Sequence, residues 1–179
     1  MKMVIVIVIL VAGSCSTSRA QTHDEKLSSG MKDAFELIKN LSGSWQGSVQ
    51  WTGAITRKGK MDASYYLTGN GSAVVENLLD HGTPVMTSVY HMDGPGLRVT
   101  HYCGTGNQPR LKADTFDPKK KWVTFQFIDI TNAPNPDAAH VSGLELQFVN
   151  AGECHVVFTF TKAGAVSWEH ITLKRTKLN

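Results

Sequence analysis

From Trp45 onward, hydrophobic and polar residues alternate in short runs that are separated by turn residues. In the first run, Trp45, Val49 and Trp51 alternate with polar residues such as Gln46 and Gln50. A period of two residues is typical of a strand that buries one face. Gly, Asn, Asp and Pro interrupt the later runs. The pattern predicts ten strands, at residues 45–52, 60–67, 72–79, 85–92, 97–103, 110–116, 122–130, 140–149, 154–161 and 166–175.

One helical pattern precedes these strands. Met31, Phe35, Ile38 and Leu41 recur at helical spacing within residues 31–41, and Gly43 follows as a stop. So short a helix is not stable alone and must pack its apolar stripe on something. We expect it to plug one end of the strand assembly.

The strand pattern indicates the fold class. Sequential strands joined by short turns, with no helix between them, favour an antiparallel meander. An open sheet would leave two exposed edges, which pairing of the first and last strands removes. We therefore predict an all-β, antiparallel up-and-down ten-stranded β-barrel with one short N-terminal helix; a two-sheet sandwich is the alternative. Side chains alone fill a barrel of about eight strands, so a ten-stranded barrel is expected to enclose a cavity.

The N-terminus has the pattern of an export signal. Lys2 precedes an unbroken apolar run at residues 3–12, and residues 18–20 resemble a small-x-small cleavage site before Gln21. The run is shorter than the roughly 20 residues that span a bilayer. Residues 12–15 resemble a bacterial lipobox, so a lipid anchor at Cys15 is the alternative; cleavage after Ala20 fits the residues better. We expect removal of residues 1–20, a flexible segment at 21–30, and one domain at 31–179, periplasmic or extracellular.

The chain without its signal is nearly neutral. Loss of Lys2 and Arg19 leaves 16 Lys and Arg residues against 15 Asp and Glu residues. The two basic clusters, residues 57–60 and 119–121, are short, lie beside turn residues and are interpreted as solvated turns. A nucleic-acid partner requires a concentrated basic surface. We expect no such partner and no stable membrane insertion after cleavage, and the oligomeric state stays open.

Two cysteines, Cys103 and Cys154, remain after cleavage and fall four predicted strands apart. Neighbouring strands are separated by about 4.8 Å, whereas a disulfide needs Cα atoms within about 7 Å. We expect two free thiols, buried as small hydrophobic side chains.

Residues 101–110 form the densest run of hydrogen-bonding side chains. His101 lies on the more apolar face of its strand and is expected to point inward, whereas Tyr102 points outward. Asn107, Gln108 and Arg110 follow at the rim, where the Arg110 fork suits a carboxylate. These five residues are the candidate ligand-binding residues. The alternative is an ordinary hairpin turn with a solvated Arg110 and a core His101 that has one partner.

Hairpin geometry restricts metal and catalytic chemistry. A turn at residues 93–96 places Ser88 opposite His101 and His91 opposite Arg98, so two histidines do not meet across this hairpin. No His-x-His or Cys-x-x-Cys spacing occurs elsewhere, and no serine lies in a Gly-x-Ser-x-Gly elbow. We therefore assign no metal site and no catalytic residue.

Gly43-Ser44-Trp45, directly after the predicted helix, resembles the Gly-x-Trp signature of the calycins, which include lipocalins and fatty-acid-binding proteins. The resemblance implies that a basic residue of the last strand, Lys174 or Arg175, packs over Trp45. The strand count is closest to the nitrobindins, which place a haem-binding histidine in a C-terminal strand of similar character to the one that holds His170. The Gly-rich continuation of nitrobindins after the Trp is missing here.

The residues and the resemblance together predict an exported barrel that binds a small, largely apolar ligand with a polar head group, without a cofactor. A haem protein that uses His170 or His101 is the first alternative. A small enzyme on the same barrel is the second, although a non-enzymatic role is favoured.

Overall fold

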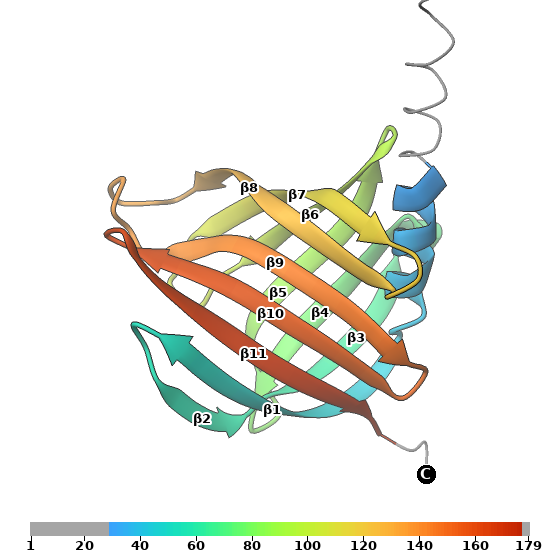
Figure 1. The fold of residues 1–179 in the computed structure, drawn as a ribbon, viewed down its shortest axis with the longest axis horizontal. Coiled ribbons are helices and arrows are strands. Elements are labelled where there is room, and N and C mark those ends of the chain that lie inside the picture. Colours follow the sequence, from blue (N-terminus) through green and yellow to red (C-terminus); the bar gives the residue numbers. More distant parts are fainter. Residues whose placement is uncertain (1–28, 177–179) are drawn as a thin grey trace, which may run out of the picture.

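Ten antiparallel strands close into a barrel in the computed structural model, which describes residues 29–176 (Figure 1). Sheet order follows chain order from β3 to β11, and β11 returns to pair with β1. This confirms the predicted meander over the two-sheet sandwich; the export signal, Cys15 and nearly all of the 21–30 segment lie outside the described residues. The elements are a helix at residues 29–39, β1 (Gly43–Gly53), β2 (Arg57–Lys60), β3 (Asp62–Thr68), η1 (Gly69–Gly71), β4 (Ala73–Asp80), β5 (Thr83–Asp93), β6 (Gly96–Tyr102), β7 (Gln108–Asp117), β8 (Trp122–Thr131), β9 (His140–Asn150), β10 (Glu153–Lys162) and β11 (Ala165–Arg175).

Strand β1 closes the barrel because it pairs along both edges. On one edge, Trp45 to Gly53 lie opposite Arg175 to Ser167 of β11. On the other edge, its first residues pair with β3. Closure leaves these strands without the exposed edge that invites pairing with other chains.

The short strand β2 corrects the sequence interpretation of residues 57–60, which are not a solvated turn. They pair antiparallel with β1, so that Trp51 faces Arg57 and Ser48 faces Lys60. The chain bends at Met61, whose N–H donates to the Gly47 carbonyl at 3.2 Å, and continues as β3. A Cβ at Gly47 would lie 2.3 Å from the Met61 carbonyl oxygen, so this approach requires glycine. All four side chains of β2 are exposed and show no apolar alternation, which explains why the pattern missed the strand.

The helix covers one end of the barrel, as predicted (Figure 1). Met31, Phe35, Ile38 and Leu41 are all buried in the core. Below the helix, the indole N–H of Trp45 donates to the Leu41 carbonyl at 2.7 Å.

Arg175 covers Trp45, as the resemblance implied. Its guanidinium lies 4.3 Å from the indole centroid. It also donates to the carbonyls of Ser42 at 2.7 Å and Asn40 at 2.6 Å, just beyond the helix. The Arg175 side chain thus connects β11 to β1 and to the segment that follows the helix.

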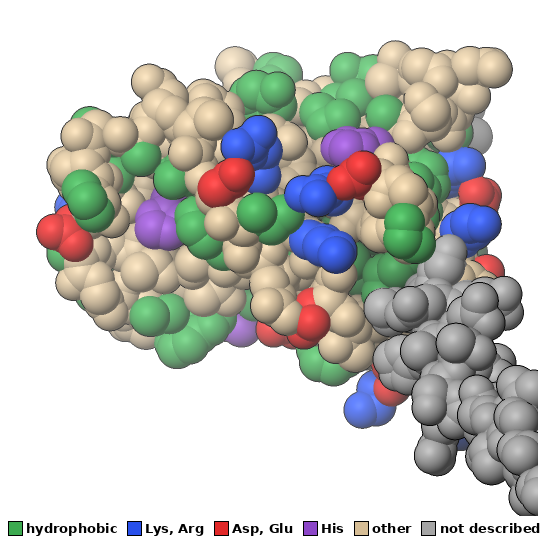
Figure 2. Space-filling view, turned by 90° about the horizontal axis from the view of Figure 1, so that it is seen from above, with side chains coloured by type: hydrophobic (Ala, Val, Ile, Leu, Met, Phe, Trp, Pro, Cys, Tyr) green, Lys and Arg blue, Asp and Glu red, His purple; other side chains and the backbone are tan. Residues whose placement is uncertain are grey.

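Both predicted free thiols are confirmed, with Cys103 directly after β6 and Cys154 on β10. Cys154 is buried as expected, but Cys103 is only half-buried. Within residues 29–176, no helix has the length and apolar character needed to cross a bilayer. On the face shown in Figure 2, acidic and basic side chains are interspersed.

Candidate ligand-binding site

The structure places His101 inside the barrel and fully buried, as its strand pattern predicted. Ser88 lies directly opposite on β5, and its hydroxyl is 3.0 Å from His101 Nδ1. The imidazole packs on Phe158, with ring centroids 4.9 Å apart. Burial lowers the pKa of His101 to about 4, and its Nε2 has no hydrogen-bond partner. His101 is therefore a neutral imidazole with one unused ring nitrogen.

Arg110 lies on the exposed side of β7, apart from the buried His101. Thr100 pairs with Arg110 across β6 and β7, and both side chains therefore point outward. Arg110 makes a two-pronged ion pair with Asp129, Nε to Oδ1 at 2.5 Å and Nη2 to Oδ2 at 2.7 Å. Tyr102 also faces outward and is 49% exposed. The structure thus separates both residues from the interior.

Asn107 and Gln108 hold the turn between β6 and β7. Asn107 is buried, donates to the Ala139 carbonyl at 2.8 Å and accepts from the Thr105 hydroxyl at 3.1 Å. Gln108 donates to Gly106 and accepts from Thr131. These hydrogen bonds satisfy the polar side chains of the turn within the protein. The bond from Asn107 also connects the turn to the loop before β9.

His170, the alternative haem ligand, lies on the outer face of β11. It is exposed, and its Nε2 is 3.2 Å from the Thr52 hydroxyl. His101, the other histidine considered, is enclosed by packed side chains and does not line the cavity described below. Neither residue therefore fits the axial position of a haem, which requires a histidine that faces an open pocket.

A row of polar side chains crosses the barrel interior and was missed by the sequence analysis. Tyr65 of β3, Glu76 of β4, Ser88 of β5 and His101 of β6 are successive cross-strand partners. We call these four residues the central row. The Tyr65 hydroxyl donates to Glu76, and the Tyr90 hydroxyl donates to the same carboxyl at 3.0 Å. Hairpin register was the signal that could have found the row, because it already paired Ser88 with His101.

Burial dominates the electrostatics of the central row. Desolvation raises the pKa of Glu76, against the hydrogen bonds from Tyr65, Ser88 and Tyr90 that lower it. The pKa of both tyrosines is raised well above the ordinary value, by burial first and by Glu76 second. The row contains a serine, a histidine and a carboxyl, but the carboxyl meets the tyrosines and not the imidazole. It is closed to solvent and is not a hydrolytic triad, because a triad requires the carboxyl to orient the imidazole.

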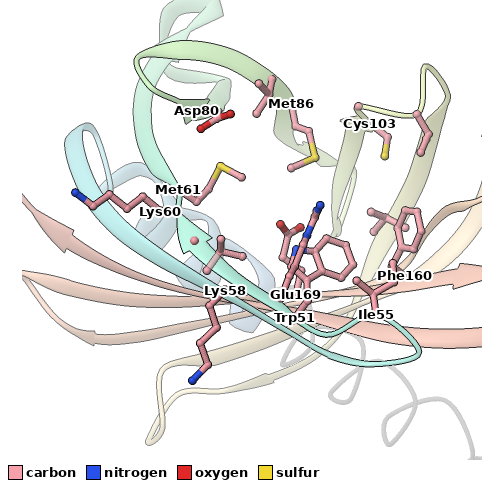
Figure 3. A pocket seen from close by; sticks show the side chains of 17 residues that line it. Trp51, Ile55, Lys58, Lys60, Met61, Asp80, Met86, Cys103, Phe160 and Glu169 are labelled. Atoms are coloured by element: carbon pink, nitrogen blue, oxygen red, sulfur yellow. The ribbon is translucent and has the colours of Figure 1, made fainter.

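A cavity of about 490 Å³ opens at the end of the barrel that β2 borders (Figure 3). One wall is β2 and the end of β1, and the opposite wall is the start of β5 and the residues after β6. Apolar side chains dominate, with the half-buried Cys103 among them. The hydrophobic members of the lining are Val49, Trp51, Ile55, Met61, Val85, Met86, Val141 and Phe160.

Two side chains give this cavity a polar wall. Glu169 of β11 and Arg57 of β2 both lie opposite Trp51 of β1, one on each side. We call Arg57, Trp51 and Glu169 the cavity row. The Arg57 guanidinium stacks 4.8 Å from the Trp51 ring centroid. The pKa of Glu169 is raised to about 7, because burial and, to a smaller extent, Glu76 outweigh Arg57 and the Trp51 N–H, which lower it.

The cavity row was not predicted. Arg57 falls within the cluster at residues 57–60 that is interpreted as a solvated turn, and Glu169 is not among the candidate residues. Alternation along β11 could have identified Glu169, since it shares a face with Ile171 and Leu173 and is 3% exposed. A carboxyl in an otherwise apolar face is a marker for a functional position.

The fold and cavity define a closed antiparallel barrel with one plugged end and one hollow end. No described protein family and no curated protein matches the sequence. Among solved structures, Rv2717c from M. tuberculosis is similar, with 15% identity, 80% of this chain and 98% of that chain covered, and a TM-score of 0.57. This likeness shows the shared fold alone.

Two further structures are similar more weakly. A redesigned beta barrel has 10% identity, 79% and 96% coverage and a TM-score of 0.38. A protein of unknown function from the DUF3598 family of Nostoc punctiforme has 9% identity, 80% and 99% coverage and a TM-score of 0.23.

Proposed function

We propose that the protein binds a small, largely apolar molecule in the cavity at the hollow end of the barrel. The observation that carries this proposal is the cavity itself, about 490 Å³ in volume with a mainly apolar lining and few polar groups. Small-molecule sites are concave and typically about 300–1,000 Å³, with sparse polar groups that orient the ligand. The closed, packed core beneath it offers a rigid floor.

The N-terminal pattern supports export, with removal of residues 1–20, as a second part of the proposal. A calycin-like relationship is supported by Gly43-Ser44-Trp45 directly after the helix and by Arg175 over Trp45. Both features belong to the plugged end, so they bear on ancestry and not on the ligand.

The five predicted ligand-binding residues receive unequal support. His101 lies under the cavity, since Cys103 and Phe160, two residues beyond His101 and Phe158, line it. Asn107 and Gln108 support the loop that borders the cavity. Tyr102 and Arg110 face solvent, and nothing in their surroundings favours contact with a ligand inside.

Cys103 offers a direct test because it lines the cavity and the other described cysteine is protected. Burial raises the pKa of Cys154 to about 12, so its thiolate is scarce at neutral pH. In a Cys15→Ser background, a bulky maleimide should modify Cys103 and fill the cavity. Fluorescence of N-phenyl-1-naphthylamine, a neutral apolar dye, should rise with the unmodified protein and not with the modified one.

The control is Cys103→Ser protein treated with the same reagent, which should bind the dye normally. Equal dye binding before and after complete modification of Cys103 would contradict the proposed site. A Soret band in protein from a haem-supplied host would instead favour the haem alternative, for which neither His101 nor His170 is suitably placed.

A further inference from the structure

The cavity row combines three polar groups on one continuous surface. Arg57, Trp51 and Glu169 are neighbours across β2, β1 and β11, on the inner face of the barrel wall. Figure 3 shows the labelled Trp51 and Glu169 together at the bottom of the cavity. Trp51 also contacts Phe160 edge-on, with ring centroids 5.7 Å apart, which fixes the indole.

Two of these groups are buried beside the cavity. The Trp51 N–H is buried and makes no hydrogen bond of normal geometry, although it is close enough to Glu169 to lower the pKa of that carboxyl. The carboxyl of Glu169 is only 3% exposed and has the Trp51 N–H beside it. Buried polar atoms are nearly always paired. Unpaired atoms that border a cavity are therefore candidates for contact with what enters it.

The groups favour an anionic partner. Arg57 and the Trp51 N–H are donors only, and a protonated Glu169 adds a third donor. At the mouth, Lys58 and Lys60 of β2 add positive charge, and Asp80 is the acidic lining residue outside the cavity row. Three donors that surround an apolar space match a group that only accepts hydrogen bonds, such as a carboxylate or sulfonate.

We propose that Arg57, Trp51 and Glu169 form the head-group site of this cavity, and that it takes an anionic amphiphile together with one proton, which is held by Glu169. This inference rests on the proposed function and specifies the ligand class. No covalent step is involved. Arg57 supplies the charge, Trp51 a fixed donor, and Glu169 a donor that exists only in its protonated form.

Proton uptake gives the site a pH dependence with a definite sign. The pKa of Glu169 without ligand is about 7, and an adjacent anion raises it further. Affinity for an anion is then constant below pH 7 and falls up to about tenfold per pH unit above it. Charged groups near Glu169 are Arg57 from β2 and Glu76 from β4. His101 on β6, with a pKa of about 4, is already neutral throughout this range.

Two matched probes test the head group separately from the cavity. 1-Anilinonaphthalene-8-sulfonate carries a sulfonate on the same ring system as the neutral N-phenyl-1-naphthylamine. We expect the affinity of the sulfonate to fall as pH rises from 7 to 8.5, while the neutral probe keeps its affinity. Calorimetry in buffers of different ionisation enthalpy should show uptake of about one proton with the sulfonate at pH 8.

Variants assign the effect to residues. Arg57→Ala should weaken sulfonate binding about tenfold, the effect of one charge-assisted hydrogen bond. Lys112→Ala is the matched control, because Lys112 of β7 is an exposed basic residue that does not line the cavity. It should change the affinity less than twofold. Glu169→Gln should abolish both the pH dependence and the proton uptake.

The possible failures are distinguishable. If neither probe binds, the cavity is not a ligand site, and both the proposed function and this inference fall. If the neutral probe binds but the sulfonate does not bind at pH 6, only the anionic head-group site falls. A pH dependence that persists in Glu169→Gln, or an Arg57→Ala variant that behaves as Lys112→Ala does, would also overturn it.

Discussion

Replacement of Glu169 by Gln should make the folded protein more stable at alkaline pH than at acidic pH, relative to the parent protein. The buried carboxyl has a pKa of about 7 when folded, against an ordinary value of 4.5. A raised folded pKa means that the native state holds the proton more tightly than the unfolded chain. Its stabilising contribution is thus complete below pH 4.5 and is lost as pH rises to 7. Glutamine keeps the shape but does not titrate.

The size of the effect follows from the two pKa values. At about 1.4 kcal/mol per pKa unit, the parent should lose about 3 kcal/mol from this group between pH 4.5 and pH 8. The loss is confined to the interval from 4.5 to 7, and the difference should be flat above it. The free energy of unfolding of the variant, minus that of the parent, should therefore be about 3 kcal/mol more positive at pH 8 than at pH 4.5.

Guanidinium chloride unfolding of both proteins at pH 4.5, 6, 7 and 8, followed by tryptophan fluorescence, measures this difference. Comparison across pH cancels any constant cost of the substitution, including altered contact with Trp51. Glu36→Gln is a suitable control because Glu36 is an exposed carboxyl whose partner is Lys39 and not a histidine. A difference for Glu169→Gln that changes by less than about 1 kcal/mol between pH 4.5 and pH 8 would refute the assigned environment.

Four other outcomes can be checked. Tyr65→Phe should destabilise the fold by about 1–3 kcal/mol in denaturant unfolding, because it removes a donor from a buried carboxyl; no change would mean that this bond is not formed. Arg175→Met should lower the free energy of unfolding by about 1–3 kcal/mol, since it removes the contact over Trp45 and three hydrogen bonds, to the carbonyls of Asn40, Ser42 and Ala151. Arg110→Ala should change stability and dye binding by less than about 0.5 kcal/mol, and a larger loss of binding would restore it as a ligand contact. N-terminal sequencing of exported protein should begin at Gln21, and a lipidated start would contradict cleavage there.

The period-two pattern predicted the barrel because burial of one face imposes it on every full strand. His101 and Tyr102 fell on the expected faces for the same reason. The pattern failed at residues 57–60, where β2 is held by backbone pairing with β1 and all side chains are exposed. No apolar alternation is needed for such a strand, so the sequence carried no signal for it.

The site was predicted less well than the fold, because the chemical type of a side chain does not show on which face of the barrel it lies, whereas strand register does. Arg110 looked suitable for a ligand, yet its pairing with Thr100 places it outside. Glu169 looked unremarkable, yet alternation places it inside. Residues 57, 51 and 169 become neighbours only because β1 pairs with β2 on one edge and with β11 on the other. No local sequence pattern reveals this pairing.

The contact of Arg175 with Trp45 affects the order in which the chain can fold. The two residues are partners at the seam between β1 and β11, so the seam cannot form until residues 45 to 175 are all available. Contacts between residues this far apart in sequence are slow to form and leave the incomplete sheet with an unpaired edge in the meantime. In a nascent chain that does not yet include β11, Arg175 does not cover Trp45 and one edge of β1 is unpaired. Until β11 pairs with β1, the partly folded barrel has an exposed strand edge that favours aggregation. A truncation that removes Arg175 and its neighbours in β11 should therefore cause aggregation first.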